Sequence, residues 1–271
     1  MSETDFAELD LSLDKLEAEL ELTQQVVKDL DEMISQCPAS GALEDEPIRT
    51  IHHLACTGGT LIAKCIASQA NILVLNEVNP FYEFSSSPEA TRFAPTNMTA
   101  LIRQGDSSFC DDELVVELFI KQLEVVRKQC WLTGRVLVIR DHTYSQFLDG
   151  DYNSDRPILR EVIQKRFPLR SLVTTRDTKK AYHSMVRRRW HRSFRPSTLE
   201  EYERRNDIFM DRFSDLPIIS YEDFTAEPRQ KMQEICEILG LTYFDGFEEV
   251  FHTFQFSGDS GRGGNQIISG R

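Results

Sequence analysis

The sequence predicts an α/β domain built on a parallel sheet with helices on both faces. Short apolar runs typical of buried strands alternate with longer amphipathic segments along most of the chain. One of these runs, Ile51 to Ala55, leads through a glycine pair directly into an apolar helical segment. The length of 271 residues also suits one α/β domain with a short additional segment.

Composition and charge exclude several classes of protein. The net charge is −13, but residues 1–50 hold 14 acidic and 3 basic side chains, so the acidity belongs to the N-terminal segment. Nothing in this pattern indicates nucleic-acid binding. No apolar run approaches the ~18 residues of a membrane helix, and the acidic N-terminus is unlike a signal peptide. The six cysteines form no C-x-x-C pair, so we expect a reduced, cytoplasmic protein without a metal site.

Residues 1–37 predict an amphipathic, coiled-coil-like helix. Its apolar positions alternate steps of four and three, at Leu9, Leu13, Leu16 and Leu20 and then at Val27, Leu30 and Ile34. Such a helix either packs on the surface of its own domain or forms an arm for homodimerisation, and we favour the arm slightly. Residues 38–48 are expected to be a polar linker, and residues 49–271 the α/β domain.

The elements of this domain follow in order. Strands are expected at residues 51–55, 71–75, 135–140, 169–175 and 217–220, and helices from Thr60 and at residues 111–131, 158–166, 177–190, 199–213 and 227–239. Residues 81–110 show no clear periodicity. A connection of that length predicts a lid over the substrate or a partly helical segment.

The turn after the first strand, Cys56 to Thr60, has the composition of a phosphate-binding loop. Paired glycines allow close approach of the backbone to a ligand, and the free amides of a helix N-terminus attract an anion. An ordinary strand-turn-helix corner explains Gly58 and Gly59 equally well. The loop lacks the Gly-Lys-Ser/Thr ending of nucleotide triphosphatases.

A second stretch strengthens the anion-binding interpretation. Arg176 follows an apolar strand, and Ser184 lies eight residues later in the next helix. The guanidinium and the hydroxyl can converge on one dianion. Either residue alone would more often be a solvated surface side chain.

In order and spacing, these stretches resemble the sulfotransferase family over about residues 49–264. Cys56 to Thr60 matches the 5′-phosphosulfate loop Lys-Ser-Gly-Thr-Thr, and Arg176 to Ser184 matches the 3′-phosphate motif. Tyr221 to Phe224 is similar to the Tyr-Glu-Asp-Leu element, and Arg262-Gly-Gly is a weak version of the loop that closes over the 3′-phosphate.

The resemblance implies a P-loop-type sheet and transfer of a sulfuryl group from 3′-phosphoadenosine 5′-phosphosulfate to a hydroxyl, without a metal. A carbohydrate is one candidate acceptor. His142, after the strand at 135–140, occupies the place of the family's base, and an imidazole can accept a proton at neutral pH. The residues implied to hold the nucleotide are Thr57, Gly58, Gly59, Thr60, Arg176, Ser184 and Arg262.

The chain departs from the family at Cys56, where a lysine is usual. Loss of one positioned donor can lower a rate by ~10² to 10³. Lys64 is the expected replacement, with Arg140 as another cation and Glu77 as a second candidate base. Two alternatives stay open: a P-loop kinase or NTPase, and a non-catalytic nucleotide-binding or scaffold protein. The basic run Arg187–Arg189, with Arg192 and Arg195, either draws in an anionic nucleotide or an acidic glycan, or is a solvated helix end.

Overall fold

The computed structural model describes residues 42–81, 97–105, 108–258 and 267. The chain divides into two compact units, Met1–Ala42 and Leu43–Arg271. The expected coiled-coil helix over 1–37 lies outside the described residues, so its existence and its role in dimerisation stay predictions. The second unit carries the sheet and all of the predicted site residues.

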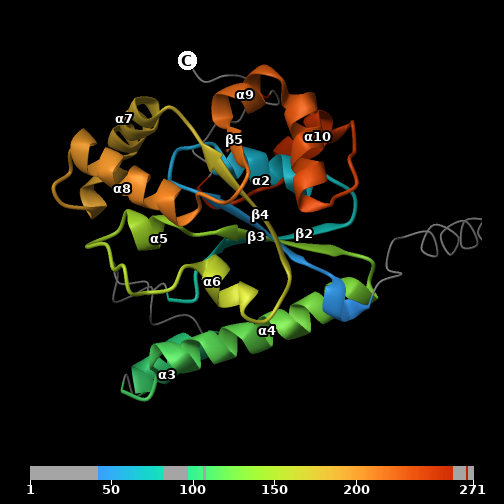
Figure 1. Cartoon of the computed structure of the whole chain (residues 1–271), viewed down its shortest axis with the longest axis horizontal. Helices are drawn as coiled ribbons and strands as arrows, with labels where there is room; N and C mark the ends of the chain where they lie inside the picture. The colour runs from blue at the N-terminus through green and yellow to red at the C-terminus, as the bar shows by residue number, and fades with distance from the viewer. Residues whose placement is uncertain (1–41, 82–96, 106–107, 259–266, 268–271) are drawn as a thin grey trace, which may run out of the picture. The chain divides into compact units, whose positions relative to one another are not determined.

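Five parallel strands form a single sheet, which confirms the predicted fold class (Figure 1). The spatial order is β2-β3-β1-β4-β5. The strands are β1 (Ile48–His53), β2 (Ile72–Val78), β3 (Val136–Asp141), β4 (Leu169–Thr175) and β5 (Ile218–Ser220). β1 begins three residues before the expected strand, inside the predicted linker. All five strands lie where the apolar runs predict them, and the three central strands β3, β1 and β4 are largely buried.

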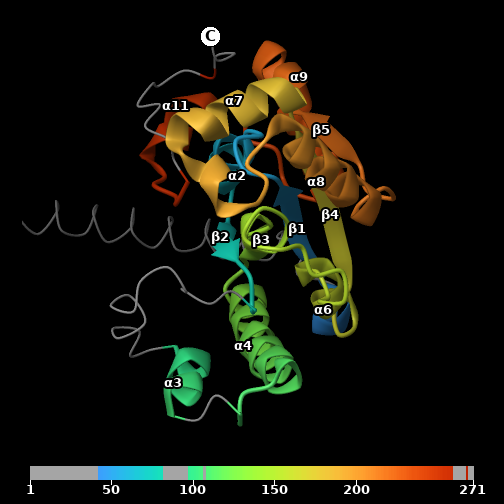
Figure 2. The same cartoon turned by 90° about the vertical axis from the view of Figure 1, so that its left-hand side faces the viewer.

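Helices cover both faces of the sheet (Figures 1 and 2). The larger helices are α2 (Gly59–Ala67), α4 (Asp112–Leu132), α7 (Thr178–Arg188), α8 (Leu199–Arg212) and α10 (Pro228–Leu239). Shorter elements complete the described part: η1 (Leu43–Asp45), α3 (Met98–Gly105), α5 (Tyr144–Phe147), α6 (Leu159–Gln164), η3 (Trp190–Ser193), α9 (Tyr221–Ala226), α11 (Phe247–Val250) and η4 (Phe251–Thr253).

Strand alternation divides the core into two sides. Ile51, Val138 and Leu172 pack with α2 and α10, whereas Leu137 and Ile139 pack with α4 and α6. Successive side chains of a strand point to opposite faces of the sheet, so two polar residues next to each other in a strand also lie on opposite faces. This alternation decides which polar side chains of β1 and β3 can contact each other near the ends of these strands.

The position of the site depends on the strand order. β1 lies between β3 and β4, and the chain leaves β1 through the glycine loop into α2. Parallel strands end at one edge, so the loop meets residues that come after β3 on one side and β4 on the other. In α/β sheets this edge is where ligands bind.

Three described α-helices, α5, α9 and α11, were not predicted, whereas α3 agrees with the expected partly helical segment at 81–110. Within 81–110, the described part contains α3, whose start is capped by the Asn97 side chain accepting from the Ala100 amide at 3.1 Å. Residues 82–96 and 106–107 lie outside the described part, so a lid there stays a prediction. α9 begins directly after β5, where the Ser220 hydroxyl accepts from the Asp223 amide.

Candidate active site

The glycine loop is held between two aromatic rings. A Cβ on Gly58 would lie 2.3 Å from Tyr221 Cδ2, and one on Gly59 would lie 2.3 Å from His53 Cγ. Gly58 also has φ = 88°, a backbone conformation that side-chain-bearing residues rarely adopt. Both glycines are therefore required by geometry, which the sequence alone left open.

The first turn of α2 presents its amides at the end of β1. The first bond inside the helix runs from the Ile62 amide to the Gly58 carbonyl at 3.1 Å. The amides of Gly58, Gly59 and Thr60 precede it, so helix geometry gives them no carbonyl within α2. Together with the positive end of the helix dipole, they suit an anion.

The two loop threonines have different roles. Thr57 is almost fully buried, and its hydroxyl donates to the Leu54 carbonyl at 2.7 Å. Its single proton is thereby used within the loop. The Thr60 hydroxyl accepts from Arg140 Nη2 at 2.9 Å, which leaves its own proton for another acceptor. Thr57 shapes the loop, whereas Thr60 is arranged to donate.

The structure brings the predicted 3′-phosphate pair to this loop. Arg176 Nη1 donates to the Cys56 carbonyl at 3.2 Å, and the guanidinium lies 4.6 Å from the centre of the Tyr221 ring. The Ser184 hydroxyl lies close enough to the Cys56 thiol to lower the pKa of that thiol. Two residues that are distant from the loop in sequence thus meet at it.

Arg176 retains capacity to bind an anion. Its side chain is 7 % exposed, and Nε lies 3.8 Å from Glu222 Oε1, beyond hydrogen-bond distance. Among the described residues, this buried Nε–H has no hydrogen-bond partner. A phosphate oxygen would supply the acceptor that such a donor requires.

Cys56 cannot replace a loop lysine as a source of charge. Burial raises the pKa of its thiol, although Ser184 and Arg176 oppose the change. The thiol is therefore neutral at pH 7. Any positive charge beside the loop has to come from another residue.

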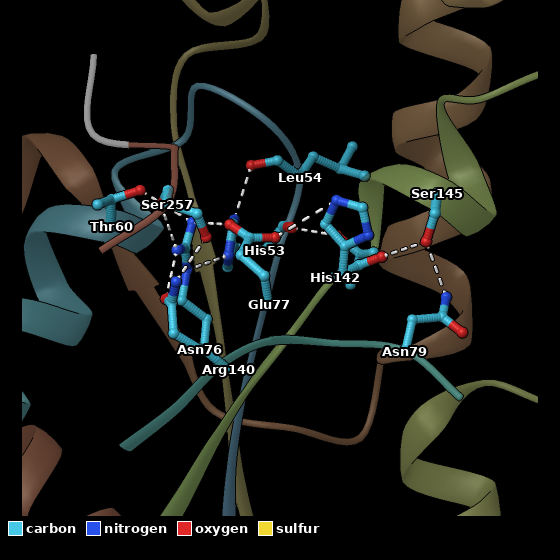
Figure 3. A network of polar contacts seen from close by, with 11 residues as sticks. His53, Leu54, Thr60, Asn76, Glu77, Asn79, Arg140, His142, Ser145 and Ser257 are labelled. Carbon is cyan, nitrogen blue, oxygen red and sulfur yellow. Dashed lines mark hydrogen bonds and ion pairs between the residues drawn. The ribbon is translucent and has the colours of Figure 1, made fainter. Parts of the chain in front are cut away.

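Arg140 supplies that charge from β3 (Figure 3). It is 2 % exposed and donates through Nε to His53 Nε2 at 2.8 Å and through Nη1 to Asn76 Oδ1 at 2.7 Å. Nη2 reaches both Thr60 and, at 2.7 Å, Glu77 Oε1. The guanidinium thus joins the helix start to the ends of β2 and β3.

Lys64, the cation that the sequence favours, lies in the last turn of α2 and is 8 % exposed. That turn is at the opposite end of the helix from the loop, about 7 Å away along the axis at 1.5 Å per residue. The catalytic role of Lys64 stays a prediction. A cation on β3 was the weaker expectation, and its contacts could not be read from sequence.

Glu77 and His142 form a pair next to Arg140. His142 Nε2 lies 3.5 Å from Glu77 Oε2, and both side chains are 19 % exposed (Figure 3). Burial, helped by Arg140, lowers the pKa of His142 from 6.5 to about 4. Burial raises the pKa of Glu77, although Arg140 opposes this. The imidazole is consequently neutral at pH 7, and the carboxylate beside it would stabilise an imidazolium.

Backbone strain marks the same place. Glu77 has φ = 60°, in the left-handed region, where β2 loses register against β3 between Leu75 and Val78. Strained residues and bulges of this kind concentrate at functional sites. The irregularity places the Glu77 carboxylate between Arg140 and His142.

His52 and His53 lie in β1 and contact residues of the neighbouring strand β3. His52 is fully buried, and its Nδ1 lies 2.7 Å from Asp141 Oδ2. Burial lowers the pKa of His53 well below its usual value, with a further contribution from Arg140, so this ring accepts the Arg140 Nε–H. The two neighbouring histidines lie on opposite faces of β1.

The end of the described chain also reaches the site. The Ser257 carbonyl accepts from Arg140 Nη1 at 3.1 Å, and the Ser257 hydroxyl accepts from Asn76 at 2.6 Å. A Cβ on Gly258 would lie 3.3 Å from both Glu77 Oε1 and Thr60 Oγ1. Arg262 lies outside the described residues, so its predicted contact with a 3′-phosphate stays a prediction.

Among the described residues, no group of three or more His, Cys, Asp or Glu side chains is placed to hold a metal. No helix in the described part of the chain is long and apolar enough to cross a membrane.

Comparison with known proteins gives structural neighbours only. No protein-family model and no curated protein matches the chain. Among solved structures, it is similar to the sulfotransferase domain of the Synechococcus PCC 7002 olefin synthase, with a TM-score of 0.48 and 16% identity over 79% of each chain. It is also similar to a sulfotransferase from Alicyclobacillus acidocaldarius, with a TM-score of 0.41 and 14% identity over 77% of this chain and 91% of that one. Both TM-scores are below 0.5, so the assignment of an activity rests on the site residues.

Proposed function

We propose that the chain is a sulfotransferase that uses 3′-phosphoadenosine 5′-phosphosulfate as donor and a hydroxyl as acceptor. One observation carries the proposal: the loop amides lie between two sets of side chains, one suited to the 3′-phosphate of the donor and the other to the hydroxyl of the acceptor. Arg176 and Ser184 meet the loop from the β4 side, and Arg140, Glu77 and His142 meet it from the β3 side.

The nucleotide would be held by its two phosphate ends. The amides of Gly58, Gly59 and Thr60, with the Thr60 hydroxyl, suit the 5′-phosphosulfate. Arg176, with its free Nε–H, and Ser184 suit the 3′-phosphate. Arg140 provides the positive charge that Cys56 does not.

The transfer forms one bond and breaks another at sulfur. The acceptor oxygen attacks the sulfur while the bond from sulfur to the 5′-phosphate oxygen breaks, and 3′-phosphoadenosine 5′-phosphate leaves with that electron pair. The acceptor proton passes to His142, which is neutral at pH 7. The Glu77 carboxylate at 3.5 Å would stabilise the imidazolium, and this offsets the weak basicity that burial imposes.

A second candidate is a nucleotide-binding protein without catalysis, and the neutral Cys56 thiol favours it. It would bind the same nucleotide but release no product from the donor. A reducing compartment such as the cytoplasm suits either protein, because the five described cysteines are all free thiols.

Calorimetric titration with 3′-phosphoadenosine 5′-phosphate tests the site. Arg176→Ala should weaken binding by at least about tenfold, since a hydrogen bond to a charged group contributes ~1.5–3 kcal/mol. Arg170→Ala is the matched control, because Arg170 is an exposed arginine at the other end of β4. Equal loss in both variants, or no binding by the wild type while ATP with magnesium binds, would refute the proposal. Binding without turnover of the donor would identify the non-catalytic candidate.

A further inference from the structure

A basic face adjoins the proposed site. Residues 178–197 hold seven Lys and Arg side chains and no Asp or Glu, in a chain whose net charge is −13. All seven side chains are exposed. They belong to α7, to η3 and to the turn after η3, and two lysines stand at the start of α7. We call the arginines Arg187, Arg188, Arg189, Arg192 and Arg195 the basic face.

Helix electrostatics explains only part of this cluster. Arg187 and Arg188 lie in the last turn of α7, where cations stabilise the negative end of the helix dipole. Arg192 and Arg195 lie beyond that helix, and the dipole effect falls off within one turn. Five arginines within residues 187–195 give this segment a local excess of positive charge, which attracts anions.

Two connections join the basic face to the site. Arg187 and Arg188 lie one turn beyond Ser184 on α7, and Ser184 lies beside the Cys56 thiol, so the start of the basic face is near the glycine loop. On the base side, the Tyr144 ring lies 6.1 Å from the His142 ring and 6.4 Å from the Trp190 ring, centre to centre. The Tyr144 hydroxyl donates to Ser193 Oγ at 2.6 Å, which fixes η3 beside α5.

We propose that the basic face binds an acidic saccharide, whose sulfate or carboxylate groups pair with the arginines. This inference rests on the proposed sulfuryl transfer and specifies its acceptor. A saccharide presents both the hydroxyl that the reaction needs and C–H surfaces that pack on aromatic rings such as Tyr144 and Trp190. Arginine forms two parallel hydrogen bonds with sulfate or carboxylate. Outside residues 178–197, residues 51–271 hold 21 basic and 30 acidic side chains, which disfavours binding of a polyanion elsewhere on the domain.

The test is binding of dextran sulfate by the full-length chain saturated with 3′-phosphoadenosine 5′-phosphate, with uncharged dextran of equal length as the reference ligand. The variant is Arg189→Asn with Arg192→Gln, since Arg189 has φ = 62° and asparagine tolerates that conformation. The matched control is Lys128→Gln with Lys165→Gln, which removes the same charge from exposed positions elsewhere. Circular dichroism verifies that both variants are folded.

For a flexible polyanion, each cation removed from the protein makes the slope of log K against log salt concentration shallower by ~0.7. Removing two cations should therefore make this slope shallower by about 1.4. If binding is equal at 1 M salt, the variant should bind dextran sulfate about 25-fold more weakly at 0.1 M. The lysine control should retain wild-type affinity. Both variants should bind the nucleotide within about twofold of the wild type, because none of the substituted residues is among those proposed to hold the nucleotide.

Equal weakening in the lysine control, or equally tight binding of uncharged dextran, would overturn the inference. Tighter binding of a single-stranded oligonucleotide of the same charge, lost in the same arginine variant, would overturn it in favour of nucleic acid. Loss of dextran sulfate binding in the arginine variant alone would uphold the anionic site. If the wild type then binds no nucleotide, the sulfuryl transfer is refuted while the binding face stands.

Discussion

Replacing Gly58 by alanine tests whether the loop is packed as the structure shows. Gly58 combines two constraints, a φ of 88° and a Cβ position 2.3 Å from Tyr221 Cδ2. Gly134 has the first constraint without the second, since its φ is 62° and no atom lies within 4 Å of its Cβ position. Gly134→Ala is therefore the matched control.

The two constraints give separate contributions to stability. An L-residue in the left-handed region costs ~1–2 kcal/mol, and this applies to both variants. Overpacking a well-packed site costs a further ~1–3 kcal/mol, which applies to Gly58→Ala alone. We expect Gly58→Ala to lower the free energy of unfolding by ~2–5 kcal/mol and Gly134→Ala by ~1–2 kcal/mol.

Urea denaturation measures both variants, with an unchanged m-value as the condition for comparing them. The double variant Gly58→Ala/Tyr221→Ala should be ~1–3 kcal/mol more stable than the sum of its single variants predicts, because removing the ring removes the clash. Gly58→Ala should also weaken nucleotide binding, since the same ring lies under Arg176. Equal destabilisation of the Gly58 and Gly134 variants, with additive double-variant energies, would refute this packing.

The two remaining predictions concern pH and a buried arginine. Because the pKa of His142 is lowered from 6.5 to about 4, the unfolded chain takes up the proton first, so stability falls as pH drops from about 6.5 to 4. Between pH 7 and pH 5 this effect lowers the free energy of unfolding by about 2 kcal/mol, and urea denaturation of His142→Asn should show that this part of the loss is gone. The same variant should abolish sulfuryl transfer. An unchanged dependence of stability on pH, together with full turnover, would contradict both roles. Arg205→Met should lower the free energy of unfolding by ~3–5 kcal/mol, because the 2 % exposed Arg205 pairs with Glu201 and with two carbonyls. Arg204→Met removes the other, 55 % exposed partner of Glu201 and should cost less than ~1 kcal/mol; similar losses would show that burial does not decide the effect.

The sheet was predictable because its central strands are buried along most of their length. Continuous apolar runs such as 72–75 and 136–139 leave little choice of secondary structure, and intervening helices require parallel pairing. α9 was missed although Ser220 and Asp223 form an N-cap pattern, because Tyr221 to Phe224 were interpreted only as a motif. The short α5 and α11 have too few residues for a periodic signal.

The site was predictable in part. Motif spacing placed Arg176 and Ser184 at the loop, and the structure brings them there. The contacts of Arg140 could not be predicted, since they depend on strand register and on the irregularity at Glu77. Alternation along β1 and β3 sends His53 and Arg140 to one face and His52 and Asp141 to the other. A register error of one residue would exchange these pairs.

Moving the cation from the loop to β3 changes how charge acts on the proposed reaction. A loop lysine is a mobile point charge that can contact the leaving oxygen directly, whereas a guanidinium is rigid and permanently charged. Arg140 is held at all three of its nitrogens by His53, Asn76, Thr60 and Glu77. Its charge therefore needs no reorganisation during transfer, but it acts through the Thr60 hydroxyl and its field. The same contacts keep the Glu77 carboxylate beside His142, so in the proposed reaction Arg140 would couple stabilisation of the leaving group to acceptance of the proton.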